Sequence, residues 1–195
     1  MIYIIDIETT GLNGYQKGDQ ILEVGIAAII GGMPTMIYES IVAPERPEEL
    51  TGHEWVFEHT SLTLEEVLKD GRSADQVRRE VESIVEGQLV TSYNTEFDFT
   101  MFLDPAWKLN THYAGIAFDL RKIATVQIME MAARYMLEAT EQNYKFIKKL
   151  IINPKATISA EDAYNILCMP TIDVKQLHRA GSDALREAAI LKALI

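Results

Sequence analysis

Short apolar runs near the N-terminus predict three β-strands with short connections. The run Ile2–Ile5 is rich in β-branched residues on both faces, which is typical of a strand buried on both sides of a sheet. Gln20–Ile30 alternates apolar positions, the segment 31–34 (GGMP) predicts a turn, and Thr35–Val42 predicts a third strand that ends before Pro44. Three consecutive strands joined in this way predict an antiparallel meander.

Farther along the chain, apolar residues recur at helical spacing between two further strands. Ser73 is expected to cap a helix over 73–86, and Gly87 is expected to end it. Further strands are predicted at 88–93 and 117–121. The other predicted helices cover 63–69, 95–103 with Pro105 as its terminator, 123–139, 144–152, 160–169 and the stretch from about Ser182 to the C-terminus. Strands first, followed by alternating helices and strands, predict an α/β fold with a mixed central sheet flanked by helices.

The helix predicted over 123–139 carries a methionine-rich apolar stripe that includes Ile123, Val126, Ile128 and Met129. Because methionine fills irregular gaps in hydrophobic cores, we expect this stripe to face the core rather than to bind a ligand.

Length and composition favour one domain over residues 1–195, large enough to bury a substantial core. No signal peptide is recognisable, and the most apolar stretch, 25–33, is too short to span a bilayer, so we expect no membrane association. The single cysteine, Cys168, excludes an internal disulfide and fits a cytoplasmic location. The net charge of −11 leaves few cations, so any nucleic acid should be contacted over a few nucleotides, with metal ions providing part of the positive field.

Two carboxylates, Asp6 and Glu8, stand where the first apolar run ends. In a strand, residues two apart point the same way, so both side chains should project from one face. The two negatively charged carboxylates repel each other, and a divalent cation such as Mg²⁺ or Mn²⁺ bound between them would relieve that repulsion. The alternative is structural: Asp6 caps the following turn and Glu8 is solvated.

Two later segments carry further acids at junctions where a helix begins. Asn94 and Asp98 are four residues apart and share a helical face, although Asp98 alone would equally complement the helix dipole. His178 precedes the last predicted helix and Asp183 lies in its first turn, although an isolated histidine there is commonly structural. In layered α/β sheets such junctions gather in one crevice. Four carboxylates and one imidazole suit two-metal phosphoryl chemistry, in which carboxylates hold the cations and the imidazole takes a proton from water.

Three motifs in order resemble those of the DEDDh 3′–5′ exonucleases, the group that contains polymerase proofreading subunits, RNase T and oligoribonuclease. The motifs are DIETTGL at 6–12, YNTEFD at 93–98 and HRAGSDA at 178–184, with ILEVG at 21–25 similar to the second strand of the family. Tyr93 stands where many members have histidine. The resemblance implies an RNase H-like fold and the release of nucleoside 5′-monophosphates from single-stranded or frayed DNA 3′ ends.

The same resemblance implies a role for each matching residue. Asp6, Glu8, Asp98 and Asp183 would hold two divalent cations, Mg²⁺ or Mn²⁺, and His178 would act as general base. The pocket for the terminal nucleotide would be lined by Thr9, Leu12, Asn94 and Phe97.

Several alternatives stay open at this point. The first concerns the substrate, which would be RNA in an RNase T-like or oligoribonuclease-like enzyme. The second concerns the partner: a DNA polymerase is a candidate, although a standalone nuclease fits as well. A non-catalytic binding module would be expected to lack one of the acidic ligands, and none is missing. Lys145, Lys148 and Lys149 share a predicted helical face near Lys155. This face would form either a solvated surface or a track for the phosphates upstream of the cleaved end.

Overall fold

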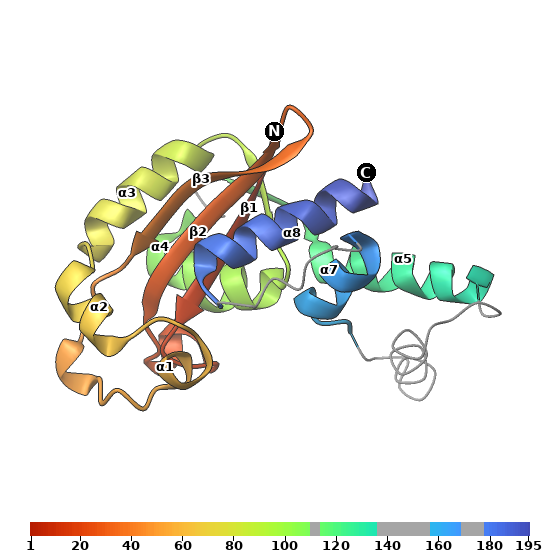
Figure 1. The fold of residues 1–195 in the computed structure, drawn as a ribbon. Helices are drawn as coiled ribbons and strands as arrows, with labels where there is room; N and C mark the ends of the chain where they lie inside the picture. Colours follow the sequence, from red (N-terminus) through yellow and green to blue (C-terminus); the bar gives the residue numbers. More distant parts are fainter. Residues whose placement is uncertain (110–113, 136–156, 169–177) are drawn as a thin grey trace.

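A computed structural model describes residues 1–109, 114–135, 157–168 and 178–195. Five strands form one sheet in the order β3-β2-β1-β4-β5. Figure 1 shows β3, β2 and β1 side by side. Strands β1 to β3 pair antiparallel, whereas β4 pairs parallel with β1 and β5 pairs parallel with β4, so the predicted mixed sheet is confirmed. The strands are β1 (Ile2–Thr9), β2 (Ile21–Ile30), β3 (Met33–Ile41), β4 (Leu89–Ser92) and β5 (Gly115–Asp119).

Helices of several kinds connect and cover these strands. Three short elements are the 3-10 helices η1 and η2 and the π-helix η3, and the others are α-helices. In chain order they are η1 (Tyr15–Lys17), η2 (Pro47–Glu49), α1 (Trp55–His59), α2 (Leu64–Asp70), α3 (Ala74–Val85), η3 (Glu96–Leu103), α4 (Asp104–Trp107), α5 (Leu120–Tyr135), α7 (Ala160–Cys168) and α8 (Ala180–Leu194).

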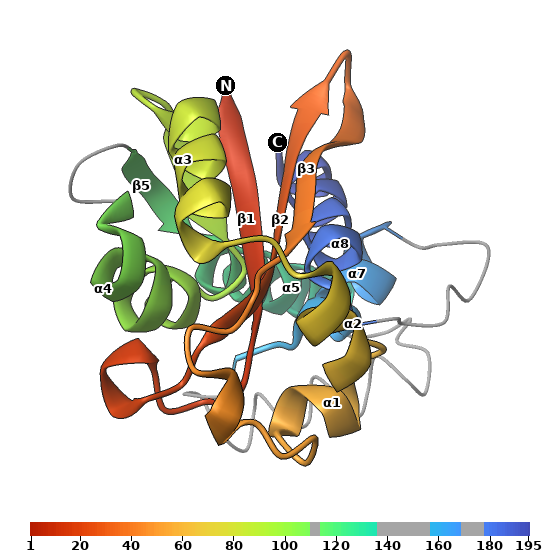
Figure 2. The same cartoon turned by 90° about the vertical axis from the view of Figure 1, so that its left-hand side faces the viewer.

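Strand β1 separates two hydrophobic cores, because its consecutive side chains point to opposite faces of the sheet. Ile4 packs into the core beneath α5, α7 and α8, whereas Ile5 and Ile7 pack against α3, η3 and α4. Figure 2 shows α3 and α4 on one side of β1 and β2, and α8 and α7 on the other. Asp6 follows Ile4 by two residues, so its side chain lies on the face that α8 covers.

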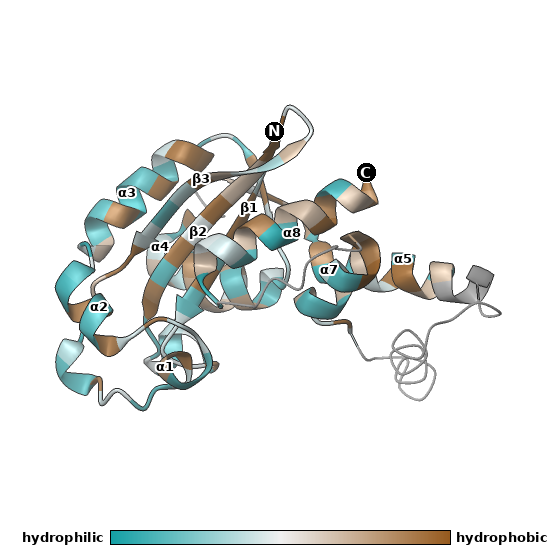
Figure 3. Cartoon of the chain, viewed as in Figure 1, coloured by the Kyte–Doolittle hydropathy of each residue, from teal (hydrophilic) through white to brown (hydrophobic). Residues whose placement is uncertain are grey.

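Burial of β1 and β2 explains their composition. In Figure 3 these strands are largely brown, whereas α2 and α3 alternate brown and teal along their length. A smaller third core lies beneath α1 and α2, where Leu22 of β2 contacts Val56, Leu62 and Val67. Both faces of the central strands are therefore covered, as continuous apolar runs predict.

Local signals in the sequence placed several boundaries well. The Ser73 side chain accepts a hydrogen bond from the amide of Gln76 and caps α3 as predicted. Gly87 adopts φ 69° directly after that helix, and Gly31 and Gly32 adopt positive φ in the turn between β2 and β3. These backbone conformations favour glycine because a Cβ would clash there.

Other boundaries differ from the prediction. Strand β1 continues to Thr9, because its ladder with β2 pairs Asp6 with Gly25 and Glu8 with Glu23. Pro105 does not end the helical segment at Leu103. It lies in the first turn of α4, where backbone amides have no partner within the helix, so the missing amide hydrogen of proline costs no hydrogen bond.

The second half of the chain shows similar shifts. Strand β5 and helix α5 begin two and three residues earlier than predicted, at Gly115 and Leu120. Helix α8 begins at Ala180 rather than near Ser182, whose hydroxyl donates to the carbonyl oxygen of Arg179 at 3.0 Å instead of capping the helix.

The apolar stripe predicted for α5 is only partly in the core: Ile128 is buried there, whereas other positions of the stripe are exposed. Leu120, Ala124 and Ile128, spaced four apart, are the buried apolar positions of its first half. Val126 is 55% exposed, and Ile123 and Met129 are exposed as well. Only one face of α5 meets α7 and α8, so Ile123, Val126 and Met129 stay outside this core.

Parts of the prediction lie outside the described residues. They include the helix at 144–152, the end of the helix at 123–139, and the lysines Lys145, Lys148, Lys149 and Lys155. Among the helices that are described, none is long and apolar enough to cross a lipid bilayer.

Candidate metal centre and active-site cavity

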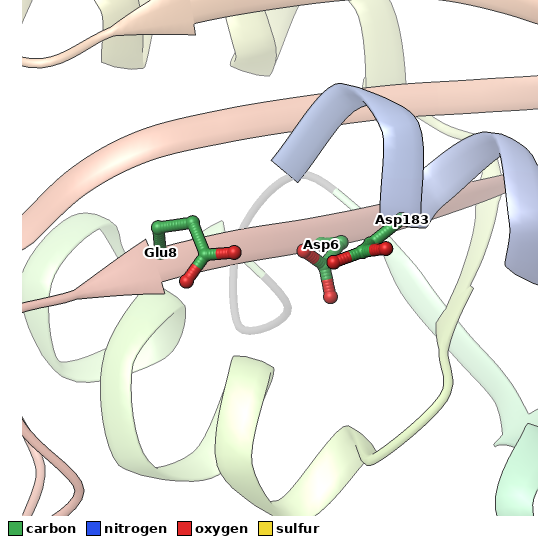
Figure 4. A group of neighbouring side chains, drawn as sticks. All are labelled: Asp6, Glu8 and Asp183. Atoms are coloured by element: carbon green, nitrogen blue, oxygen red, sulfur yellow. The ribbon is translucent and has the colours of Figure 1, made fainter. Parts of the chain in front are cut away.

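Acids from the two ends of the chain meet beneath the start of α8. Carboxylate oxygens of Asp6, Glu8 and Asp183 lie within 4.8 Å of one another. Figure 4 shows the first two projecting from β1 and Asp183 descending from the first turn of α8 toward Asp6. The structure thus brings together three of the four acids that the sequence singled out.

The start of α8 is held in place by a buried acid of β2. Glu23 is fully buried, and its carboxylate accepts hydrogen bonds from the Ala180 amide at 2.9 Å and from Arg179 Nε at 2.8 Å. A Cβ on Gly25 would collide with the carbonyl oxygen of Ala180, so glycine is needed for this close approach. The segment ILEVG therefore fixes where Asp183 stands relative to β1.

The fourth acid, Asp98, reaches the same site from the π-helix η3. It is 3% exposed, and its amide donates to the carbonyl oxygen of Asn94 at 3.0 Å. Asp98 lies outside the group of three within 4.8 Å, but it lines the same cavity as Asp6 and Asp183. Local π-helical geometry is frequent at functional sites, where it redirects one side chain.

A cavity of about 240 Å³ opens between β1, η3 and α8. It is lined by acidic, basic and aromatic side chains from five segments of the chain. These are Asp6, Ile7, Tyr93, Asn94, Phe97, Asp98, Ala160, His178, Asp183, Arg186 and Glu187.

The predicted nucleotide-binding residues fall into two groups. Asn94 and Phe97 line the cavity, whereas Thr9 and Leu12 do not. Thr9 is buried and its hydroxyl donates to the carbonyl oxygen of Gly11 at 2.7 Å, and Leu12 is 53% exposed.

Asn94 does not cap the helix that follows it. The residue that precedes η3 is Thr95, whose hydroxyl donates to Asp119 at 3.1 Å. The side-chain oxygen of Asn94 is buried without a hydrogen-bond partner among the described residues. A ligand in the cavity would satisfy this acceptor.

His178 lines the cavity. Its Nδ1 lies 3.9 Å from a carboxylate oxygen of Asp183, and its side chain is 44% exposed. Its φ of 43° lies in the left-handed region, which is uncommon for residues other than glycine and recurs at functional sites. The imidazole is therefore accessible and is held beside one of the clustered acids.

Two charged residues of the cavity, Arg186 and Glu187, were not predicted from the sequence. Arg186 donates to Asp183 at 2.5 Å, and its guanidinium lies 5.8 Å from the centre of the Tyr164 ring. Glu187 is 3% exposed and accepts a hydrogen bond from the Tyr93 amide at 3.0 Å. Their spacing of three and four from Asp183 places them on the same helical face, which is the signal that would have identified them.

Burial and mutual repulsion raise the pKa values of the acids of this site. Burial, followed by the charges of Asp183 and Glu23, raises the pKa of Glu8 to about 9. Burial raises the pKa of Asp98 to about 7. The pKa of Asp6 lies well above its ordinary value because of burial and the nearby Glu187. Burial likewise raises the pKa of Asp183, although Arg186 and His178 oppose this change.

This chemistry fits a site for hard divalent cations. Carboxylate oxygens are the ligands that Mg²⁺ and Mn²⁺ prefer, and a cation would relieve the repulsion that raises these pKa values. Asp6, Glu8 and Asp183 are close enough to share one ion, and Asp98 lines the same cavity.

Comparison with known families gives a match to the RNase_T exonuclease family over residues 3–191. The chain belongs to this exonuclease family. The match covers nearly the whole sequence and includes all three motifs, so the resemblance to DEDDh exonucleases of the RNase H-like superfamily is confirmed.

Individual relatives agree with this assignment. The PolC-type DNA polymerase III proteins of Thermotoga maritima and Thermotoga petrophila are each 30% identical over 96 residues, which is 49% of this chain. The aligned part is 6% of the length of either relative.

Solved structures share the fold. Exonuclease X in complex with 5′ overhanging duplex DNA aligns with a TM-score of 0.57 and 18% identity, covering 100% of this chain and 90% of that one. A full-length 3′-exonuclease aligns with a TM-score of 0.57 and 18% identity, covering 98% of this chain and 79% of its own.

Proposed function

We propose that this exonuclease removes nucleoside 5′-monophosphates from single-stranded or frayed 3′ ends of DNA, with two divalent cations, Mg²⁺ or Mn²⁺, as cofactors. The observation that carries the proposal is the meeting of Asp6, Glu8 and Asp183 oxygens within 4.8 Å. In a nuclease, carboxylates that lie far apart in the sequence and close together in space are suited to bind paired cations, because such cations need several carboxylate ligands.

The four acids of the motifs and His178 each have a role in this proposal. Asp6, Glu8, Asp98 and Asp183 would hold the cations, which would supply positive charge to neutralise the charge that develops on the scissile phosphate. His178 takes a proton from the attacking water, and the neighbouring Asp183 stabilises the imidazolium that results.

The terminal nucleotide would enter beside η3. Phe97 offers an aromatic face on the cavity wall, and the unpartnered oxygen of Asn94 offers an acceptor for a sugar or base donor. Stacking on an aromatic side chain tolerates any base, which suits an enzyme that removes successive nucleotides.

DNA is proposed rather than RNA because of the relatives. The matching segment belongs to a DNA polymerase in both Thermotoga proteins, and one structural neighbour was solved with duplex DNA. The same relationship supports a DNA polymerase as the partner of this chain.

The test uses 5′-labelled single strands of DNA and RNA with one sequence, each with a free 3′ hydroxyl or a 3′ phosphate. We expect DNA with a free 3′ end to shorten one nucleotide at a time with Mg²⁺ or Mn²⁺, and to stay intact in EDTA. Asp183→Asn should lose nearly all turnover, whereas Asp70→Asn, an exposed acid of α2, should retain it.

The outcomes separate the parts of the proposal. Cleavage in EDTA would refute the cation requirement, and shortening from the 5′ end would refute the polarity. Faster degradation of RNA than of DNA would assign the enzyme to the RNA-directed branch instead.

A further inference from the structure

Glu187 is a buried acid for which the proposed reaction has no use. It lies on α8 one turn after Asp183, is 3% exposed and lines the cavity beside Asp6. Burying a carboxylate is unfavourable unless specific partners satisfy its oxygens. The contacts of Glu187 therefore indicate what it does.

Glu187 joins three elements of the site. One oxygen accepts a hydrogen bond from the Tyr93 amide at 3.0 Å, directly after β4 ends at Ser92. Its carboxyl group also lies near that of Asp6 on β1, because both residues line the cavity and the charge of Glu187 raises the pKa of Asp6. A single side chain of α8 thus faces Asp6 and contacts the point from which Asn94 and Asp98 follow.

The contact to Tyr93 has geometric consequences for η3. The Tyr93 hydroxyl donates to the carbonyl oxygen of Ile158 at 2.8 Å, so Tyr93 is anchored by its side chain as well as by its amide. Two hydrogen bonds thus restrain the backbone where it leads into η3. Asp98 follows five residues later, in the first turn of η3.

We propose that Glu187 is a positioning residue that orients Asp6 and fixes the end of β4 for cation binding. This inference rests on the proposed cation site. The role requires a side chain that reaches both the Tyr93 amide and Asp6, and does not require a charge. Glutamine retains this reach without a charge, whereas aspartate retains the charge but is shorter by one methylene group.

The experiment measures Mn²⁺ affinity of the full chain by titration calorimetry, without substrate. Glu187→Gln should bind Mn²⁺ within about threefold of the wild type, whereas Glu187→Asp and Glu187→Leu should bind roughly 10–100-fold more weakly, as is usual when a residue that orients a metal ligand is lost. Glu82→Leu is the matched control, because Glu82 is a buried glutamate paired with Arg78 on α3. It should bind like the wild type.

Two results would overturn the inference. If Glu187→Asp binds normally and Glu187→Gln does not, the charge matters and Glu187 is a direct ligand. If all three variants bind like the wild type, Glu187 has no part in the site. Near-ultraviolet circular dichroism checks folding, and Glu187→Asp carries the test if Glu187→Leu does not fold. A wild-type protein that binds no Mn²⁺ would refute the proposed cation site itself.

Discussion

Replacing Asp98 by asparagine should stabilise the cation-free protein while it abolishes activity. The substitution keeps the size of the side chain and removes one charge from a cavity that several buried acids line. Because ionised Asp98 is buried among like charges, the folded state bears a cost that the unfolded chain does not.

The size of this cost follows from the pKa of Asp98. Burial raises that pKa from 3.8 to about 7. Each pKa unit corresponds to about 1.4 kcal/mol, so the ionised form destabilises the fold by up to about 4 kcal/mol. The amide also needs hydrogen-bond partners, so we expect a net gain of about 2 kcal/mol, or roughly 4–8 °C in Tm for a chain of this size.

The sign of the pH dependence is fixed by proton linkage. Between about pH 4 and pH 7 the folded protein holds a proton on Asp98 that the unfolded chain has released, so wild-type stability falls as the pH rises. Above about pH 7 both states are ionised and the cost stays constant. The advantage of Asp98→Asn should therefore be larger at pH 8 than at pH 4.5.

The assay is thermal unfolding of both proteins in EDTA and in Mg²⁺ at these two pH values. Mg²⁺ at a hundred times its dissociation constant should stabilise the wild type by about 2.7 kcal/mol and remove the advantage of the variant. Asp70→Asn on the exposed surface of α2 should change stability by less than about 0.5 kcal/mol throughout. A lower Tm for Asp98→Asn in EDTA at pH 8 would refute the reasoning.

Other substitutions test how the site is built. Gly25→Ala should cost about 1–3 kcal/mol in denaturant unfolding and weaken Mn²⁺ binding, because α8 must move away from β2; unchanged binding would contradict this. Arg179→Met should cost about 3–5 kcal/mol by leaving buried Glu23 unpaired, and adding Glu23→Leu should recover much of that stability if the pairing is the cause. On α5, Ile128→Ala should cost about 2–5 kcal/mol and Val126→Ser less than about 0.5 kcal/mol in the same measurement, whereas equal costs would mean that both faces are packed.

The order of strands and helices could be predicted because local signals and the global fold agree. The apolar runs of β1 and β2 are long, and glycine at 31, 32 and 87 permits the backbone conformations that the turns require. The motif acids could be located because Asp6 and Glu8 alternate along one strand, and Asp98 and Asp183 each lie in the first turn of a helix. Such signals can be recognised without a structure because each depends on only a few residues that are neighbours in the sequence.

Features that depend on tertiary contacts could not be predicted in the same way. Helical spacing alone does not say which side of α5 meets α7 and α8, so Val126 was assigned to the core. Pro105 was expected to stop a helix, although the same residue is compatible with the first turn of a new one. The start of α8 depends on Glu23, which is more than 150 residues away in the chain.

The cavity contains more acidic residues than the motifs supply, and the charged residues of α8 show how the additional acid is balanced. The motif supplies four acids, which two divalent cations would balance. This chain adds a fifth buried acid, Glu187, and in the preceding position a cation, Arg186, that pairs with Asp183. Added together, the two residues leave the net charge of the proposed cation-loaded cavity unchanged while they contribute hydrogen bonds to Asp183 and to the end of β4. An acid added alone would have raised the repulsion among its neighbours, so the two positions are best understood as one structural unit that supports the cation ligands.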